Sequence, residues 1–439
     1  MKRQITVNLG NLLLSLSEIT DLMNPLVSQH QQKTAFIAIE IAKAFDVNPD
    51  ILEKIFTAAL FHDIGAITVE EKLAVHKGKD VNLDVHCIKG EILLNKIPWF
   101  QKIAKTVRHH HRIWIDWEDS LDNPLVLTSQ IILLADSVER MIQDDQYILH
   151  QSGIIMEQIQ RMQDRVIAGE LVRCFLEVAA REEFWLDLVS PRLYHVLLSQ
   201  GPYRNVEIDM NGISLIADLF RDIIDFKSSF TATHTSGVSA CAEIMGSLFG
   251  LTDVEIHWLR IAGNLHDIGK LVIPNSILEK RGKLTPTEAA VMRCHTYYTF
   301  YVINSIGGLS NIAEWAAYHH EKLDGSGYPF HCRSFEIDIG SRILTVADIF
   351  TALAEDRPYR TGMNKKQIFS VMKEEANQNK LEPKIVELLF DHYDSISDYV
   401  KERQTLAKQF YDQRFLAVLA ESKENNIESV GRQLGFDSV

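Results

Sequence analysis

The most chemically informative residues of this sequence are two sets of histidines and aspartates that recur in the same order. Each set holds five histidines and two aspartates, including one His-Asp pair and one His-His pair. The first set is His30, His62, Asp63, His86, His110, His111 and Asp136. The second set is His234, His266, Asp267, His295, His319, His320 and Asp348. Imidazole and carboxylate groups are common ligands of divalent metal ions.

The spacing within the two sets matches closely. His30 precedes His62 by 32 residues, and His234 precedes His266 by the same number. From the third histidine of each set to the His-His pair, the step is 24 residues in both halves. A single histidine on an apolar helix face is most often an ordinary core residue, but seven residues recurring in order are poorly explained in that way. The repetition indicates two homologous domains rather than a solenoid.

The His-Asp pair predicts a particular chemistry. In the second half, His266 and Asp267 follow the apolar face of a predicted helix, where a buried charge is costly unless something neutralises it. Imidazole and carboxylate ligands without thiolate suit iron, manganese, nickel or zinc better than they suit a structural zinc site. One aspartate with ligands on both sides can bridge two ions, and ions about 3.5–4 Å apart favour displacement at phosphorus. The expected reaction class is metal-assisted phosphoester hydrolysis.

Further motifs in the second half carry a family resemblance. They are His266-Asp267, His319-His320-Glu321, the Asp-Gly-Ser-Gly-Tyr-Pro stretch at 324–329, and Asp-Arg-Pro-Tyr-Arg at 356–360. Over about residues 210–400 the chain resembles the HD-GYP family of cyclic dinucleotide phosphodiesterases, which act on bacterial second messengers. The His-Asp pair alone would be a weak signal, whereas the combination is highly specific.

The resemblance implies a role for each matching residue. One metal ion would be held by His234, His266, Asp267 and Asp348, and the other by Asp267, His295, His319 and His320. Lys270 would act as a catalytic group that contacts the scissile phosphate or the bridging hydroxide. The groove would be shaped and lined by Gly325, Gly327 and Tyr328. The substrate would also contact Arg357 and Arg360, whose guanidinium groups can bind phosphate or stack on guanine.

The resemblance also implies cofactors and a substrate. Family members with a third metal ion use a carboxylate where this chain has Phe230, so two divalent ions, iron or manganese, are expected. The expected reaction opens cyclic di-GMP to linear pGpG, with further cleavage to GMP and the use of hybrid cyclic GMP-AMP left open. One alternative is a scaffold that senses a cyclic dinucleotide, a metal or a redox signal without turnover. Another is an HD phosphohydrolase that acts on nucleotides.

The first half keeps the ligand types but lacks the residues that would bind substrate. Ala66 stands where the second half has its lysine, and Arg112-Ile-Trp-Ile-Asp116 replaces the Gly-Tyr-Pro loop. The positions that match the two arginines are Asp145 and Ile148, which cannot hold a phosphate. The first half is therefore expected to be a degenerate regulatory or structural domain. Whether its own ligand set binds metal is left open.

Composition limits the partners and the location of the protein. The chain has 439 residues, enough for two or three domains, and its net charge of −14 argues against binding to polymeric nucleic acid. Its five cysteines are scattered without a Cys-x-x-Cys pattern, so they are expected to be reduced thiols of a cytoplasmic protein, and none is expected to bind metal. No apolar run is long enough to predict a membrane span.

Helical periodicity dominates the sequence and predicts an all-α fold, with two homologous helical domains in tandem. A Gly-Pro turn near residues 200–210 marks the boundary and gives domains at 1–200 and 201–439. One long helix is expected over 152–183, and its length makes a homodimer plausible.

Three helix starts carry recognisable signals. Pro49 and Pro286 each follow a plausible N-cap residue, and Thr252 opens a capping-box pattern. The helix that begins at Thr252 is expected to end at His266 and Asp267, so its length positions the pair.

Overall fold

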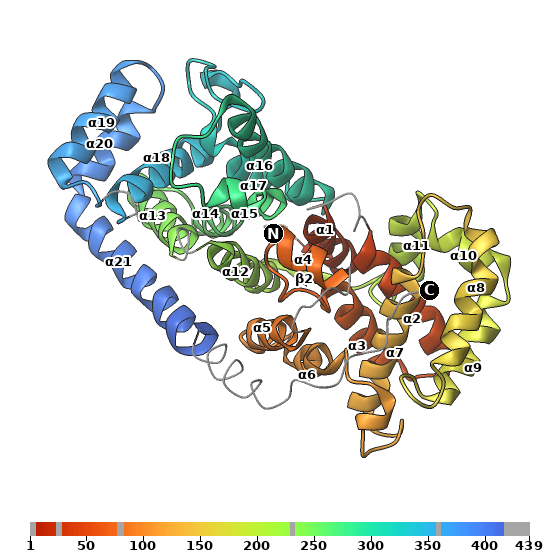
Figure 1. Ribbon diagram of the computed structural model, residues 1–439. Helices are drawn as coiled ribbons and strands as arrows, with labels where there is room; N and C mark the ends of the chain where they lie inside the picture. Colours follow the sequence, from red (N-terminus) through yellow and green to blue (C-terminus); the bar gives the residue numbers. More distant parts are fainter. Residues whose placement is uncertain (1–5, 23–28, 77–82, 229–232, 357–360, 417–439) are drawn as a thin grey trace.

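The computed structural model describes residues 6–22, 29–76, 83–228, 233–356 and 361–416. Apart from two short strands, the regular elements that these residues form are all helices, which confirms the expected all-α class, and the two halves lie beside each other (Figure 1). The first half forms β1 (Thr6–Asn8), α1 (Leu9–Asp21), α2 (His30–Ala44), α3 (Pro49–Phe61), α4 (Val69–His76), α5 (Leu83–Asn95), α6 (Gln101–His109), the 3₁₀ helix η2 (Trp114–Asp116), α7 (Pro124–Arg140), α8 (Ile148–Arg161), α9 (Gly169–Ala179), α10 (Glu182–Leu188) and α11 (Leu193–Gln200). None of the described helices is both long and apolar enough to cross a membrane.

The second half continues with a similar series of helices. Its elements are β2 (Glu207–Asp209), α12 (Met210–Lys227), α13 (His234–Phe249), α14 (Asp253–Leu265), η3 (Ile268–Val272), α15 (Asn275–Leu278), α16 (Pro286–Ser305), α17 (Ser310–Ala317), η4 (Tyr318–His320), η5 (Ser334–Glu336), α18 (Ile339–Ala354), α19 (Lys365–Asn377), α20 (Pro383–Asp391), α21 (Tyr393–Phe410) and the π-helical turn η6 (Tyr411–Leu416).

Side-chain caps define where several of these helices begin. Asn48 accepts a hydrogen bond from the backbone N–H of Ile51, and α3 starts at Pro49 as expected. Thr252 and Thr285 each form a capping box with the glutamate three residues later, at the starts of α14 and α16. The caps satisfy N–H groups that lack a partner within the helix, and so they fix helices that carry the candidate ligands.

The repeat in the sequence is also a repeat of helices. In order, α2, α3, α5, α6 and α7 of the first half correspond to α13, α14, α16, α17 and α18 of the second. The candidate ligands occupy the same places in both copies: the first residue of α2 or α13, the end of α3 or α14, the body of α5 or α16, the residues after α6 or α17, and the body of α7 or α18. Each ligand set therefore depends on the packing of five helices.

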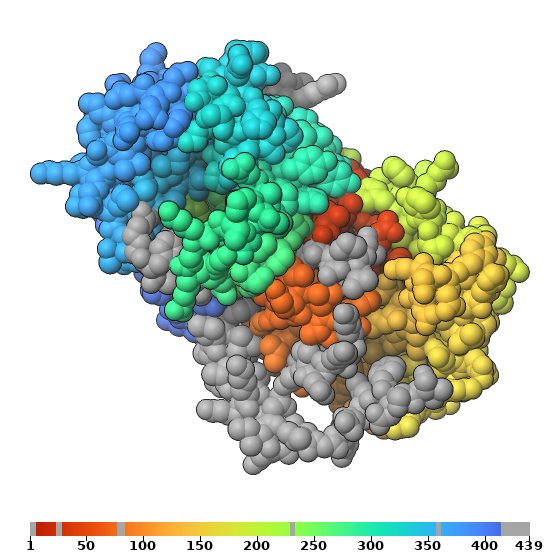
Figure 2. Space-filling model, turned by 45° about the horizontal axis from the view of Figure 1, so that its top comes forward, coloured from red at the N-terminus to blue at the C-terminus, as the bar shows by residue number. Residues whose placement is uncertain are grey.

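The start of the described chain joins the two halves. β1 pairs with β2 in an antiparallel arrangement, with Val7 opposite Ile208, although no strand was expected. α1 packs against α2 and α3 of the first half and against α16 of the second. Nδ2 of Asn11 donates to the carbonyl oxygens of Ser305 and Ile306 at 3.1 and 2.6 Å. Figure 2 shows the red and orange N-terminal elements lying against the green helices of the second half.

The structure does not test the expected domain limits, 1–200 and 201–439, which stay a prediction. The chain leaves α11 and enters β2 within the predicted boundary region. The contacts of α1, however, extend to both halves, so this helix cannot be assigned to one of them by contacts alone.

The single long helix expected over residues 152–183 is wrong. The structure has α8, α9 and α10 in this region. Asp164 adopts a left-handed backbone conformation (φ 56°), and its Oδ1 accepts the N–H of Gly169 at 2.9 Å, which starts α9. Ile155 and Ile159 are buried in the core of the chain itself. The homodimer expectation therefore loses the long helix on which it was based.

Replacing Asn11 with alanine tests the link between the halves. The change leaves two carbonyl oxygens of α16 and its C-terminus without their donor, so we expect a loss of about 1–3 kcal/mol of stability and a lower melting temperature in calorimetry. Asn211→Ala is the control, because Asn211 is exposed and bonds to Asp209 only two residues away. Equal melting temperatures for the two variants would show that the contact does not stabilise the joined halves.

Candidate metal centre

The structure brings all seven candidate ligands of the second half together. They form two neighbouring groups with Asp267 between them; the groups are His234, His266 and Asp348, and His295, His319 and His320. Oδ2 of Asp267 lies 3.2 Å from Nε2 of His266. Its Oδ1 lies 3.5 and 3.7 Å from Nε2 of His295 and His319. The two oxygens of one carboxylate thus face different groups, which is a geometry suited to a bridging ligand.

The histidines are oriented by hydrogen bonds on the far side of each ring. Nδ1 of His266, His295 and His319 donates to the carbonyl oxygen three residues earlier, at 2.8, 2.6 and 2.7 Å. The proton is therefore on Nδ1, and the Nε2 lone pair points into the cluster. His234 is held instead by a carboxylate, with its Nδ1 3.0 Å from Oε2 of Glu355. Sequence reasoning missed Glu355, because it lies outside the motifs that identified the other residues.

The protonation states of the ligand side chains in this cluster favour the binding of metal cations. Burial opposes ionisation of Asp267, but His266 and Lys270 beside it hold its pKa well below the usual range. Burial lowers the pKa of His295 to about 3 and that of His320 to about 4, so both imidazoles are neutral and able to act as ligands. Nε2 of His266 and Oδ1 of Asp267 are buried and make no hydrogen bond. Metal ions bound here would account for these unpaired atoms.

Lys270 reaches the same carboxylate from η3. Its Nζ lies 2.5 Å from Oδ2 of Asp267, and 17% of its side chain is exposed, against 1% for the aspartate. The ammonium group therefore lies at the solvent edge of the cluster. In the first half the matching residue, Ala66, is buried and offers no charge.

The glycine after each His-Asp pair is required by close packing. A Cβ on Gly269 would lie 1.9 Å from the carbonyl oxygen of His295, and a Cβ on Gly65 would lie 2.0 Å from that of His86. Only glycine allows the segment after the pair to approach the helix that carries the next histidine. The His-Asp-Ile-Gly pattern thus records a packing constraint as well as ligands.

The loop after His320 is organised by Glu321. This buried carboxylate accepts hydrogen bonds from the backbone N–H groups of residues 330, 331 and 332, at 2.7–3.1 Å. Gly325 has a φ of 80°, and a Cβ on Gly327 would lie 2.4 Å from Cα of Glu321, so both positions require glycine. As a result the ring of Tyr328 lies 4.9 Å from that of His320.

Other predicted substrate residues cannot be placed. Arg357 and Arg360 lie outside the described residues, and so does Phe230, on which the expected number of metal ions partly rests. The structure adds a cation that the sequence did not single out: the guanidinium of Arg293 lies 5.5 Å from the ring centre of Tyr328. Arg293 lies two residues before His295, and this position could have suggested a location near the site.

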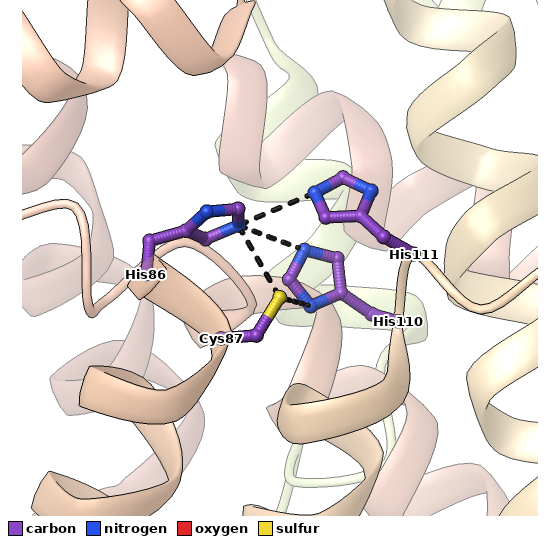
Figure 3. A group of neighbouring side chains, drawn as sticks. All are labelled: His86, Cys87, His110 and His111. Atoms are coloured by element: carbon purple, nitrogen blue, oxygen red, sulfur yellow. Dashed lines mark hydrogen bonds between the residues drawn. The ribbon is translucent and has the colours of Figure 1, made fainter. Parts of the chain in front are cut away.

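The first half assembles its own ligands and adds a cysteine. Its groups include His30, His62 and Asp63, and His86, Cys87, His110 and His111, and His30 also forms a group with His76 and Glu139. Asp63 lies between them, with Oδ2 3.5 Å from Nε2 of His30 and Oδ1 3.3 Å from Nε2 of His86. Cys87, which was not expected to bind metal, lies beside these histidines, with its Sγ 3.6 Å from Nε2 of His86 (Figure 3).

Asp136, the last predicted ligand of the first half, has a competing partner. Its Oδ1 lies 3.5 Å from Nε2 of His30 but only 2.7 Å from Nε of Arg140. The second half has Ala352 at the position of this arginine, so the aspartate there has no guanidinium one turn away.

The first half also lacks the carboxylate that organises the loop. Arg112 stands at the position of Glu321, and its guanidinium bonds to the carbonyl oxygen of Asp116 and lies 4.4 Å from the ring centre of Trp117. A guanidinium cannot accept the backbone N–H groups that a glutamate accepts. The absence of a Gly-Tyr-Pro loop and the change of this residue therefore belong together.

Comparison with known proteins assigns both halves. A family model described as an HD domain matches residues 218–385, and a second model with the same description matches residues 27–141. The chain is a tandem HD-domain protein. The two groups of candidate ligands in each half lie within these matches, as expected for metal-dependent HD domains.

Several relatives of these HD domains are cyclic dinucleotide phosphodiesterases, which confirms the resemblance drawn from the motifs. The 3'3'-cGAMP-specific phosphodiesterase 1 of Vibrio cholerae is 28% identical over 82% of this chain and 86% of its own length. A cyclic di-GMP phosphodiesterase of Thermotoga maritima is 33% identical over 43% of this chain and 52% of its own length. The crystal structure of a cyclic GMP-AMP specific phosphodiesterase of V. cholerae aligns with a TM-score of 0.62 at 21% identity, covering 89% of this chain and 98% of that one. This likeness shows the fold.

Substituting Gly269 tests the packing of the second HD domain around its ligands. In Gly269→Ala the new methyl group would displace η3 from His295, so we expect a loss of roughly 1–3 kcal/mol of stability and weaker retention of bound metal. The control is Gly282→Ala, where no atom lies within 4 Å of the added carbon. Calorimetry and metal analysis after dialysis measure both effects, and wild-type metal retention in Gly269→Ala would contradict the expectation.

Proposed function

We propose that the second HD domain hydrolyses a cyclic dinucleotide in a reaction that depends on two metal ions. The observation that carries the proposal is the position of Asp267, a buried carboxylate that faces two histidine groups and Lys270. Two divalent ions, iron or manganese, would supply a hydroxide nucleophile and neutralise the scissile phosphate. The first group of ligands would be His234, His266 and Asp348, and the second would be His295, His319 and His320, with Asp267 shared.

The protein's own side chains act on the substrate from the edge of this cluster. The Lys270 ammonium can contact a phosphate oxygen and stabilise the negative charge that grows there in the transition state. Burial raises the pKa of Tyr328, so its phenol stays neutral and can donate a hydrogen bond to the substrate. Arg293 beside this ring supplies a further cation. We retain Arg357 and Arg360 as phosphate or guanine contacts on the basis of the sequence motif.

The identity of the cyclic dinucleotide is proposed from the extent of the similarities. The V. cholerae relative specific for 3'3'-cGAMP is similar over 82% of this chain, and therefore over both HD domains. The T. maritima cyclic di-GMP phosphodiesterase is similar over 43%. This difference favours 3'3'-cGAMP as a substrate beside cyclic di-GMP, which the motifs alone had put first. With two ions, we expect the reaction to stop at the linear dinucleotide, pGpG in the case of cyclic di-GMP.

The first HD domain is proposed to be regulatory or structural. It lacks a lysine at Ala66 and the loop that Glu321 holds in the second domain. A purely sensing role for the whole chain is the competing proposal. Lys270 favours turnover, because a non-catalytic scaffold has no need of an ammonium group on the shared carboxylate.

Lys270→Ala separates catalysis from metal binding. Without the ammonium group, we expect kcat to fall roughly 10²–10³-fold while the metal content stays unchanged. Asp267→Ala should lose both activity and metal. The matched control is Lys283→Ala, since Lys283 is exposed and belongs to neither ligand group. A kcat for Lys270→Ala equal to that of Lys283→Ala would rule out the catalytic role.

Product analysis tests the substrate. The purified chain with Mn²⁺ or Fe²⁺ should convert both 3'3'-cGAMP and cyclic di-GMP to linear products, with the higher kcat/KM for 3'3'-cGAMP. Chromatography after incubation with and without a chelator measures the conversion. If neither compound is opened with either metal, the phosphodiesterase proposal fails and the sensing scaffold replaces it.

A further inference from the structure

We propose that the first HD domain holds one zinc ion rather than two ions, and that Arg140 takes the place of the second cation. The four ligands of this ion are three histidines and a cysteine: His86, Cys87, His110 and His111. The second domain has no matching thiolate. Thr296 stands at the position of Cys87, and its Oγ1 donates to the carbonyl oxygen of Arg293 at 3.0 Å.

The distances from Nε2 of His86 to the other three side chains fit a tetrahedral zinc site. Zn–N bonds of 2.0–2.1 Å and a Zn–S bond of about 2.3 Å place two nitrogens about 3.3 Å apart, and a nitrogen and a sulfur about 3.6 Å apart. In the structure Nε2 of His86 lies 3.4 Å from Nε2 of His110, 3.2 Å from Nε2 of His111 and 3.6 Å from Sγ of Cys87. Figure 3 shows the four side chains turned toward one another.

Hydrogen bonding within the protein does not account for this cluster. Nδ1 of His110 donates to the carbonyl oxygen of Val107 at 2.6 Å, so it cannot also accept the proton of Cys87, whose Sγ is 3.6 Å away. Nε2 of His86 faces two nitrogens and a sulfur, and a single proton can serve only one of them. Oδ1 of Asp63 also faces Nε2 of His86 and is buried without a hydrogen bond. One ion at the centre would engage the lone pairs of the three histidines and the cysteine.

The donor set favours zinc over the metals proposed for the second domain. A thiolate is a softer ligand than a carboxylate, and mixed cysteine and histidine ligands are typical of closed zinc sites. Cys87, His86 and His110 are each at least 96% buried, and His111 is partly exposed. A zinc ion with four protein ligands has no open position for a substrate, so it stabilises a fold or responds to thiol chemistry, and both agree with a domain that lacks a substrate loop.

Arg140 explains why one ion is proposed instead of two. Its guanidinium pairs with Asp136 at 2.7 Å and also donates to the carbonyl oxygen of Val75 at 2.8 Å, so it is fixed beside the group that contains His30. Because the guanidinium already neutralises Asp136, this aspartate is a poorer ligand for a second divalent ion. The second domain has Ala352 at this position and keeps its aspartate available.

Cobalt substitution tests the thiolate ligand. Co²⁺ bound to a thiolate gives a near-ultraviolet charge-transfer band that imidazole and carboxylate ligands do not give. We expect the band when the metal-free full chain is saturated with Co²⁺, and we expect it to vanish in Cys87→Ser. Cys294→Ser is the matched control, because Cys294 adjoins His295 but its Sγ donates to the carbonyl oxygen of Val291 at 2.8 Å. A missing band in the unaltered chain, or a band that survives Cys87→Ser, overturns the proposal.

Zinc content tests the role of Arg140. Loss of a residue that only hydrogen-bonds to a metal ligand typically weakens metal binding roughly 10–100-fold. Because Cys87 is proposed as a ligand itself, we expect Cys87→Ser to weaken the binding of one zinc ion by more than this. We expect Arg140→Gln to bind one additional ion per chain. Far-ultraviolet circular dichroism checks that each variant is folded. Unchanged zinc content in folded Arg140→Gln would overturn the role of the arginine. These readouts do not use hydrolysis, so their failure would be distinct from a failure of the proposed phosphodiesterase.

Discussion

The structure depends on burying a carboxylate at the centre of each half. Asp267 and Asp63 are both nearly inaccessible to solvent, where an anion is stable only if positive charge or hydrogen-bond donors surround it. The surrounding helices place histidines around the aspartate. Nδ1 of His266 and of His62 donates to the backbone carbonyl oxygen three residues earlier, so the Nε2 atom of each ring points toward the carboxylate. The glycine after the pair then allows the next ligand helix to approach. The ligands, the glycine and the helix caps are therefore parts of one solution.

The two halves solve the same problem with different surroundings. In the second half, an ammonium group and a glutamate-held loop lie beside the cluster, and both are suited to a phosphate substrate. In the first half, Ala66 stands at the position of the lysine and Arg112 at the position of the glutamate. Cys87 lies beside the histidine ligands. The two halves share the arrangement of the helices that carry the ligands, and they differ in the residues that would contact a substrate. Divergence of this kind needs few substitutions, because the costly part is the shared packing.

Much of this could be predicted from sequence because the decisive signals are local. The ligand spacing identified the repeat, and Asn48 and Thr252 marked helix starts whose positions the structure confirms. Other features depend on contacts between distant segments and left little local signal. The bond between Glu355 and His234 joins residues 121 positions apart, and the pairing of β1 with β2 involves three residues from each strand. The long-helix prediction failed because periodicity does not reveal a left-handed residue such as Asp164.

The position of α1 has a consequence for the order in which the molecule assembles. Asn11 bonds to residues almost 300 positions later, and the strand before α1 pairs with one about 200 positions later. During synthesis, one face of α1 must therefore wait for much of the second half before it is covered, and closing so long a loop is slow. Until then the apolar side of this helix is open to solvent or to chaperones. The first helix of the described chain is thus among the last to have all its contacts formed, and the docking of the two halves depends on residues near the start of the sequence.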